Sequence, residues 1–350
     1  MIIVGVMSGS SLDGLDIAVV QFNEKTDWKI LWTYDTPYSK DWVERLKKYS
    51  QLSATEYILF KSAYSKYIGE LLKDALSSYS EPVDYISFHG HTLMHLPEKG
   101  ITEQIGNGGV LAALLKIPTI TDFRTQDVTM GGVGTPLAPL VEINLFPGHD
   151  YYLNLGGIAN ITKFGLSKNI IAYDVCPCNQ VLNYYSNLVG KGYDEEGNLA
   201  RKGAKNEDVV EFLNSIPYFR LEAPKSLDNN WIIDEMIPNM PTGKVEDMLH
   251  TYCNWMSSCI ANEVGVNKDK TSMMVSGGGV HNTYFMECLK RELGKINCEL
   301  HIPSNSIIDF KEAILMSLMA CKYLKGKSNV LSAVTGASSD SIGGALYKVK

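Results

Sequence analysis

The sequence predicts an α/β protein made of two related halves, and three features carry this prediction. Residues 2–7 and 15–22 are apolar runs with the alternation of paired strands, joined by a turn of small and polar residues. Residues 151–164 repeat this theme, with an apolar strand, a turn of Gly and Asn and a second apolar strand. Helical and strand patterns alternate after each hairpin, as in a sheet covered by helices. We therefore expect a duplicated architecture.

The first half continues with two helices. A helical stretch covers about 41–49, and a longer helix begins after Ser53, where Glu56 stands at the spacing of a capping box. Apolar side chains recur at helical spacing between Tyr57 and Leu72. The remaining elements of this half are expected as a strand at 83–88, a helix at 108–116, a strand at 117–123 and a glycine-rich loop at 131–136.

The second half follows its hairpin with a similar series. We expect strands at 170–174, 272–276 and 298–302, and helices at 179–189, 206–215, 246–264, from Asn282 onward and at 309–324. No linker or low-complexity segment separates the halves, so they should pack closely.

Composition excludes several classes of partner. The 350 residues are 45% hydrophobic and carry a formal net charge of −7, whereas nucleic acids and anionic membranes are usually met by a basic patch. No stretch approaches the roughly 20 apolar residues of a membrane span. Without an export signal, the seven cysteines indicate reduced thiols in a cytoplasmic protein.

The glycine-rich turns are candidate phosphate-binding sites, because small side chains leave backbone N–H groups open to anionic oxygens. Asp13 could hold Mg²⁺ through water, since this ion needs few carboxylates. The run Gly277–Gly279 at a strand end suits a flat base or sugar. Each turn could equally be a plain connection, but neither a P-loop nor a convincing G-x-G-x-x-G occurs. The candidate ATP-binding residues are Gly9, Ser10, Ser11, Leu12, Asp13, Gly14, Leu15, Asp16, Asn154, Gly156, Gly157, Asn160, Gly277, Gly278 and Gly279.

Several long motifs resemble the anhydro-N-acetylmuramic acid kinase family, within the actin, Hsp70 and sugar-kinase superfamily. They run nearly end to end and include MSGSSLDGLDIA, HGHTLMHLP, TEQIGNGGVLA, TDFRTQDVTMGGVGTPLAP, NLGGIANIT, APKS, VSGGGVHN and VTGA. The resemblance implies a two-domain actin-like fold, each domain a mixed sheet flanked by helices, with ATP in the cleft between them. The expected N-terminal domain comprises residues 1–127 together with about 331–350, where the C-terminal segment returns to it. The expected C-terminal domain comprises residues 128–330.

The resemblance also implies an activity. Such a kinase opens the 1,6-anhydro bridge of the sugar with water and phosphorylates O6, using ATP and Mg²⁺, in cell-wall recycling. A carboxylate must take the proton of the attacking water. The rest of the reaction is alignment and charge neutralisation. A homodimer is expected from the same resemblance.

Candidate catalytic and substrate residues follow from the matching positions. Asp174 matches the family's base, although an Asp there could also cap the next helix, and Asn179 ends the same motif. Asp122 and Arg124 form a charged cluster with Asp127, either as sugar contacts or as an Arg–carboxylate pair, and Asp122 is the reserve base. Glu312 matches an acid near the substrate.

The chain departs from the family pattern on the substrate side. The motif D-x-G-P-G-N has Cys176 and Cys178 in place of both glycines, and cysteine at a positive φ would cost about 1 kcal/mol or more. P-K-S-T-G-R-E becomes residues 224–230 without its arginine and glutamate, and His91 replaces the glutamine of H-G-Q-T. A kinase of another sugar, and a nucleotide-dependent sensor without turnover, remain alternatives. A metal hydrolase built on His89, His91 and His95 is a third.

Overall fold

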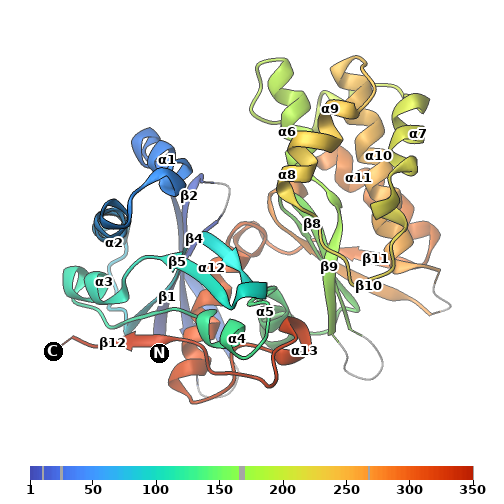
Figure 1. Cartoon of the computed structure of the whole chain (residues 1–350). Helices are drawn as coiled ribbons and strands as arrows, with labels where there is room; N and C mark the ends of the chain where they lie inside the picture. Colours follow the sequence, from blue (N-terminus) through green and yellow to red (C-terminus); the bar gives the residue numbers. More distant parts are fainter. Residues whose placement is uncertain (10–11, 24–26, 165–169, 267–268, 350) are drawn as a thin grey trace. The chain divides into compact units, whose positions relative to one another are not determined.

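The computed structural model describes residues 1–9, 12–23, 27–164, 170–266 and 269–349, which form two compact units (Figure 1). Unit 1 comprises Met1–Pro147 and Phe310–Lys350, and unit 2 comprises Gly148–Asp309. None of the helices within the described residues combines the length and apolarity that a membrane crossing requires.

These limits differ from the expected boundaries at residues 127 and 331. The segment after residue 127 belongs to unit 1 because its side chains and backbone interact with other residues of that unit. Glu142 forms a buried ion pair with Lys311 at 3.0 Å, and the Val133 amide donates to the Thr335 carbonyl at 2.8 Å. Ser317 likewise ties the helix after residue 309 to unit 1, since its hydroxyl donates to the Ile3 carbonyl at 3.3 Å.

The sheet of unit 1 has seven strands in the order β12-β6-β4-β1-β2-β3, with β5 pairing with β4. β1 pairs antiparallel with β2 and parallel with β4, and β4 pairs parallel with β6. The strands are β1 (Ile2–Ser8), β2 (Gly14–Phe22), β3 (Trp28–Pro37), β4 (Tyr85–Leu96), β5 (Ile101–Ile105), β6 (Thr119–Thr121) and β12 (Ala345–Tyr347).

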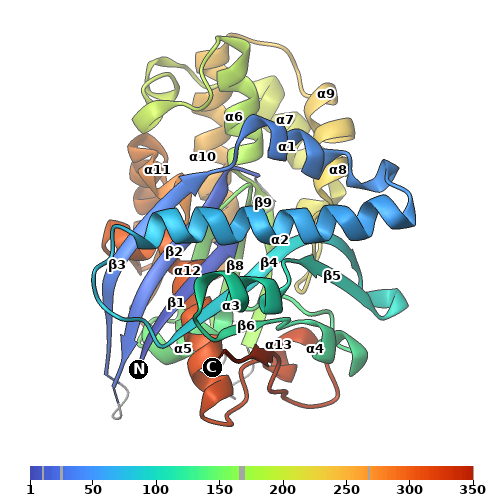
Figure 2. The ribbon, with the colours of Figure 1, turned by 90° about the vertical axis from the view of Figure 1, so that its left-hand side faces the viewer.

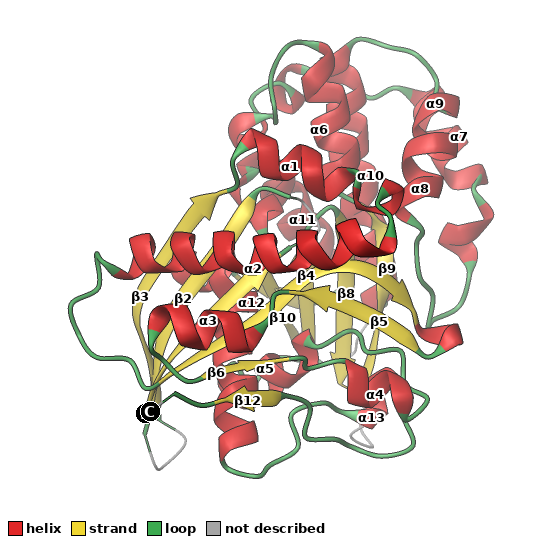
Figure 3. Cartoon of the chain, turned by 60° about the vertical axis from the view of Figure 1, so that its left-hand side comes forward, coloured by secondary structure: helices red, strands yellow, loops and turns green. Residues whose placement is uncertain are grey.

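Helices cover both faces of this sheet, with α2 and α3 on one face and α12 on the other (Figures 2 and 3). Val4 and Val6 of β1 join the core cluster that contains Tyr64 of α2. Gly5 between them faces α12, where an added Cβ would lie 1.9 Å from the Ala313 carbonyl oxygen. The α-helices here are α1 (Lys40–Lys47), α2 (Ala54–Leu76), α3 (Gly108–Leu115), α4 (Thr125–Thr129), α5 (Ala138–Leu145), α12 (Asn305–Leu324) and α13 (Ser332–Thr335).

Unit 2 has a five-stranded sheet in the order β11-β10-β7-β8-β9. Its strands are β7 (Tyr151–Leu155), β8 (Ile158–Phe164), β9 (Ile170–Pro177), β10 (Thr271–Ser276) and β11 (Cys298–His301). Its α-helices are α6 (Asn179–Leu188), α7 (Glu207–Ser215), α8 (Asn229–Trp231), α9 (Ile237–Asn239), α10 (Val245–Val264) and α11 (Thr283–Lys295). One apolar core joins the sheet to α6, α7, α10 and α11.

The two sheets share one topology. Each begins with three antiparallel strands in sequence, β1-β2-β3 or β7-β8-β9. In each, the next strand pairs parallel with the first, as β4 does with β1 and β10 with β7, and one more parallel strand follows. The predicted α/β class with duplicated mixed sheets is therefore confirmed.

Candidate active site

Asp174 lies in β9 with its carboxylate held by one neighbouring segment. Its Oδ2 accepts hydrogen bonds from the Leu227 amide at 3.0 Å and from the Ser226 hydroxyl at 3.2 Å. Its own amide donates to the Lys225 carbonyl at 3.1 Å. Burial raises the pKa of Asp174 above its usual range, although the two hydrogen bonds favour the charged form. The residue lies inside the strand, which continues to Pro177 rather than ending at residue 174 as expected.

The two cysteines after Asp174 are part of the core. Cys176 and Cys178 are fully buried, and neither has a positive φ, with Cys178 at −126°. The positive φ that would have strained a cysteine is therefore absent at both positions. Burial raises the pKa of Cys178 to about 12, and it also raises the pKa of Cys176, so both thiols are neutral at physiological pH. Buried neutral thiols are chemically inert.

A charged network that sequence reasoning missed lies behind Asp174. The Lys225 ammonium, 4% exposed, is 2.7 Å from Glu263 Oε1. Glu263 Oε2 accepts the hydroxyl of Tyr173 at 2.6 Å, and Lys163 lies 3.6 Å away. The hydroxyl of Tyr218 donates to the Asp174 carbonyl at 2.8 Å. In the sequence, only the APKS motif pointed to this region.

The second hairpin turn, Asn179 and the glycine run meet in unit 2. The Gly156 and Gly157 carbonyls accept the amides of Asn179 at 3.1 Å and Cys178 at 2.8 Å. Asn179 Nδ2 donates to the Leu155 carbonyl at 3.1 Å.

The glycine run packs on the same turn. An added Cβ on Gly279 would lie 2.7 Å from the Leu155 Cβ, and Gly277 has a φ of +88°, which favours glycine. Cross-strand pairing then places Asn160 opposite both Asn154 and Asp174. The candidate residues of unit 2 are thus brought together.

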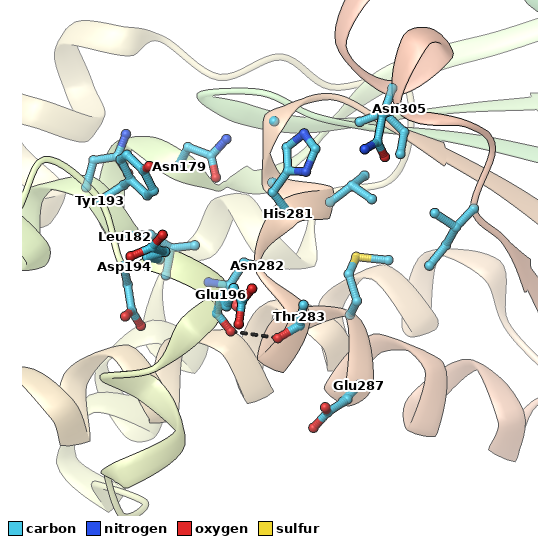
Figure 4. A pocket seen from close by; sticks show the side chains of 18 of the residues that line it. Asn179, Leu182, Tyr193, Asp194, Glu196, His281, Asn282, Thr283, Glu287 and Asn305 are labelled. Atoms are coloured by element: carbon cyan, nitrogen blue, oxygen red, sulfur yellow. Dashed lines mark hydrogen bonds between the residues drawn. The ribbon is translucent and has the colours of Figure 1, made fainter.

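A cavity of about 900 Å³ opens beside the glycine run (Figure 4). Its lining combines the polar side chains of Asn179 and Asn282 and the backbone of Gly278 with the apolar side chains of Ile302 and Ile308. The 193–196 segment also lines it and is fixed where Thr283 Oγ1 donates to the Glu196 carbonyl at 2.8 Å. Sequence reasoning found the glycines but not this wall. A cavity with one flat backbone face and apolar sides fits a nucleobase.

In unit 1, the first turn follows β1. Gly14 lies so close to β3 that an added Cβ would be 2.0 Å from the Thr36 carbonyl oxygen. Leu15 is buried in β2, and Asp16 pairs across from Met7. Gly9 and Leu12 flank the tip, whose residues Ser10 and Ser11 lie outside the described residues.

Asp13 is the acidic group of this turn. Its carboxylate is exposed, and none of the described residues hydrogen-bonds or ion-pairs with it. A free carboxylate of this kind fits Mg²⁺ that keeps most of its waters.

The histidines of HGHTLMHLP each bond a different group. His89 Nδ1 donates to the Gly90 carbonyl at 2.8 Å, and burial lowers its pKa to about 3. His91 Nδ1 is 2.9 Å from the Ser8 hydroxyl, and burial lowers its pKa to about 4. His95 Nδ1 is 3.0 Å from Thr102 Oγ1. Within the described ranges, no group of three His, Cys, Asp or Glu side chains could hold a metal ion.

The cluster around Arg124 divides into separate roles. Asp127 is fully buried and accepts the Gly134 amide at 2.8 Å and the Thr335 hydroxyl at 2.7 Å, so it fixes the glycine-rich loop. Asp122 accepts the Thr125 amide at 3.3 Å. Neither carboxylate pairs with Arg124 within 4.0 Å, so of the two alternatives for this cluster the structure does not show the Arg–carboxylate pair. Burial lowers the pKa of Arg124 to about 10, and nearby Glu312 opposes that shift.

Arg124 also has a buried donor nitrogen that is available to a ligand. Its Nε is buried and has no hydrogen-bond partner among the described residues. Desolvation raises the pKa of Glu312, while Lys311 and Arg124 favour its charged form. The side chain of Glu312 itself reaches solvent. An arginine donor and an acid of this kind are suited to a polar ligand.

A family model and two relatives identify one family for this chain. The family model described as anhydro-N-acetylmuramic acid kinase matches residues 1–349. A protein of that name from Sulfurimonas denitrificans is 31% identical, with 99% of each chain covered. Another from Zymomonas mobilis is 31% identical over 100% of both chains. Among solved structures, a ligand-bound xylulose kinase from Lactobacillus acidophilus has a TM-score of 0.47 at 10% identity, covering 100% of this chain and 94% of that one.

Proposed function

Because this chain belongs to the anhydro-N-acetylmuramic acid kinase family, we propose that it opens the bridge of 1,6-anhydro-N-acetylmuramic acid with water and phosphorylates O6. Family membership makes it a carbohydrate kinase that uses ATP on an amino sugar. The observation that carries the finer proposal is the position of Asp174, which pairs across the strand with Asn160 of the second glycine-rich hairpin.

Asp174 is the general base of this proposal. Water attacks C1 of the sugar while the Asp174 carboxylate takes one of its protons. The C1–O6 bond breaks, and O6 is then free to take the γ-phosphoryl group of ATP. Oδ2 is oriented by Ser226 and Leu227, which fixes the plane of the carboxylate. Asp122 is the alternative base, although one of its carboxylate oxygens already accepts the Thr125 amide at 3.3 Å.

The nucleotide is assigned mainly to unit 2. The cavity beside Gly278 takes the base and ribose, and the amides of the turn at Asn154–Gly157 bind phosphate oxygens. The first turn, from Gly9 to Asp16, supplies further amides. Asp13 would hold Mg²⁺ through water, and the ion would neutralise phosphate charge.

The sugar side is assigned to four residues. Arg124 offers a buried Nε without a described partner, which can donate to a sugar oxygen. Glu312 and Asp122 offer acceptors for hydroxyl groups, and Asn179 stands next to the nucleotide cavity. We also propose a cytoplasmic homodimer that serves cell-wall recycling. Family membership supports these points, and the buried free cysteines are in keeping with a reducing compartment.

The decisive experiment incubates the protein with Mg-ATP and the anhydro sugar, beside a panel of ordinary hexosamines. We expect the 6-phosphate of N-acetylmuramic acid from the anhydro sugar. Asp174→Asn should lower kcat by about 10²–10⁴, the usual contribution of a general base, with the Kd for ATP unchanged.

Three results would change this assignment. Near-wild-type turnover by Asp174→Asn would transfer the role of base to Asp122. Product only from another hexosamine would identify a kinase of that sugar. ATP binding without any product would identify a nucleotide-dependent sensor.

A further inference from the structure

We propose that Glu263 is a positioning residue that fixes Asp174 from behind, through Lys225 and Tyr173. This inference rests on the proposed function of Asp174 as the base. Glu263 stands in the last turn of α10 and touches neither the carboxylate of Asp174 nor the cavity beside the glycine run.

Glu263 holds the segment that in turn holds the base. Its Oε1 binds the ammonium of Lys225 at 2.7 Å, and that side chain is almost completely buried. Lys225 and its two successors make all three contacts described above with the amide and carboxylate of Asp174. The Lys225 ammonium also donates to the Leu221 carbonyl at 3.2 Å. The position of residues 225–227 therefore depends on a buried charge that Glu263 neutralises.

The other carboxylate oxygen holds the strand residue before the base. Glu263 Oε2 accepts the hydroxyl of Tyr173 at 2.6 Å, and Tyr173 immediately precedes Asp174 in β9. One carboxylate thus restrains both segments whose relative placement sets the direction of the Asp174 side chain. Because a buried ion pair is weak evidence for a gain in stability, we assign the pair of Glu263 and Lys225 a role in the geometry of the base.

The charge of Glu263 is well supported. Burial favours its neutral form, but hydrogen bonds from Lys225 and Tyr173 and the charge of Lys163 together lower its pKa below the usual range. Glu263 is therefore ionised at physiological pH. Lys163 completes the anchor, since its ammonium donates to the Glu263 carbonyl at 2.6 Å.

The test compares Glu263→Gln with Glu292→Gln. Glu292, on α11, is a matched control, because it also faces two cations, Lys295 and Arg291, and is similarly covered at 15% side-chain exposure against 20%. We expect Glu263→Gln to lower kcat about tenfold or more, with the KM values for ATP and sugar within twofold. The acid limb of kcat/KM should move to higher pH, since looser Ser226 and Leu227 donors stabilise the charged form of Asp174 less. Glu292→Gln should match the wild type.

Further variants separate positioning from damage to the fold. Lys225→Met should give the same loss, and the double variant should be no worse than either single one, because the two groups act as a unit. If Glu263→Gln does not fold, Tyr173→Phe is tested instead, because it removes only the hydroxyl that bonds Glu263. A lower kcat and a shifted acid limb in that variant would support the positioning role. Wild-type kcat and pH profile in the folded variant would overturn the inference. A near-wild-type Asp174→Asn variant would instead transfer the role of base to Asp122, and the inference would fall with the assignment of Asp174 while the proposed kinase activity stood.

Discussion

Asp174 sits in an environment that makes its activity sensitive to pH. A base works only when deprotonated, so kcat/KM should fall as the pH drops through the pKa of Asp174. Burial raises that pKa, so the fall should occur at higher pH than for an exposed aspartate near 3.9. Ser226→Ala removes one hydrogen-bond donor to Asp174 Oδ2. The charged form of Asp174 is then less stable, so the acid limb of the kcat/KM profile should move to still higher pH. The measurement is kcat/KM for the sugar against pH.

A second serine provides the control for this prediction. Within the described part of the chain, the hydroxyl of Ser258 on α10 bonds only the Asn254 carbonyl of its own helix, at 3.2 Å. Ser258→Ala should leave the acid limb where it is in the wild type. An acid limb that stays fixed or moves down in Ser226→Ala would show that Asp174 is not the group that titrates.

The cysteines beside Asp174 show where single residues resist prediction. Replacement of two glycines by cysteine raised the expectation of strain, because glycine often marks a positive φ. The backbone instead runs in the strand through Cys176, and Cys178 precedes α6 with a negative φ. The sequence shows which residue type stands at a position, but φ depends on the pairing of β8 with β9 around it.

At the scale of elements, the glycine run offers a selective test of the nucleotide cavity. An added Cβ on Gly278 would have only Asn179 Nδ2 within reach, at 4.0 Å, and Gly278 lines the cavity. Gly278→Ala should therefore fold normally but place a methyl group in the proposed nucleotide site. We expect the Kd for ATP, measured by calorimetry, to rise about tenfold or more, since overpacking of a close contact costs about 1–3 kcal/mol.

Gly294 near the end of α11 is the matched position. An added Cβ there meets no atom within 4 Å, and the residue does not line the cavity. Gly294→Ala should keep the wild-type Kd and stabilise the helix by about 0.5–1 kcal/mol. Equal ATP affinity in both variants would exclude Gly278 from the nucleotide site.

The elements themselves were predictable where their hydrophobic pattern was strong. The hairpin β7–β8 and the helix α2 with its Ser53 cap follow the expected ranges closely. β3 was missed because it is the half-exposed last strand of the sheet order, with no fully buried residue. The network behind Asp174 was missed for another reason. Its members Tyr173, Lys225 and Glu263 are far apart in sequence and meet only through the packing of α10 on the sheet.

At the scale of the whole molecule, the two copies of the sheet carry different candidate functional residues. The second copy carries Asp174, the turn of Gly156 and Gly157, and the nucleotide cavity. The first copy carries Asp13 and the buried Arg124 donor. The shared topology explains why two glycine-rich hairpins recur in the sequence. It also shows why such a hairpin alone cannot identify the unit that holds the proposed base.

The chain passes between the two units twice, and one buried ion pair joins the helices next to both passages. Glu142 lies in α5, just before the boundary at Pro147, and Lys311 follows the boundary at Asp309. Their side chains are 2% and 5% exposed and 3.0 Å apart. Lys311→Met leaves a buried carboxylate without its partner, which typically costs about 3–5 kcal/mol. We expect urea unfolding of unit 1 at a clearly lower midpoint.

Two further variants separate loss of the partner from loss of the lysine. Glu142→Leu combined with Lys311→Met removes both charges and should recover most of the midpoint, because an apolar pair of similar volume replaces a buried ion pair at little cost. Lys270→Met breaks only an exposed pair with Glu299 and should leave the midpoint unchanged, since such pairs are screened by water. Equal midpoints for Lys311→Met and Lys270→Met would show that the buried pair does not stabilise unit 1.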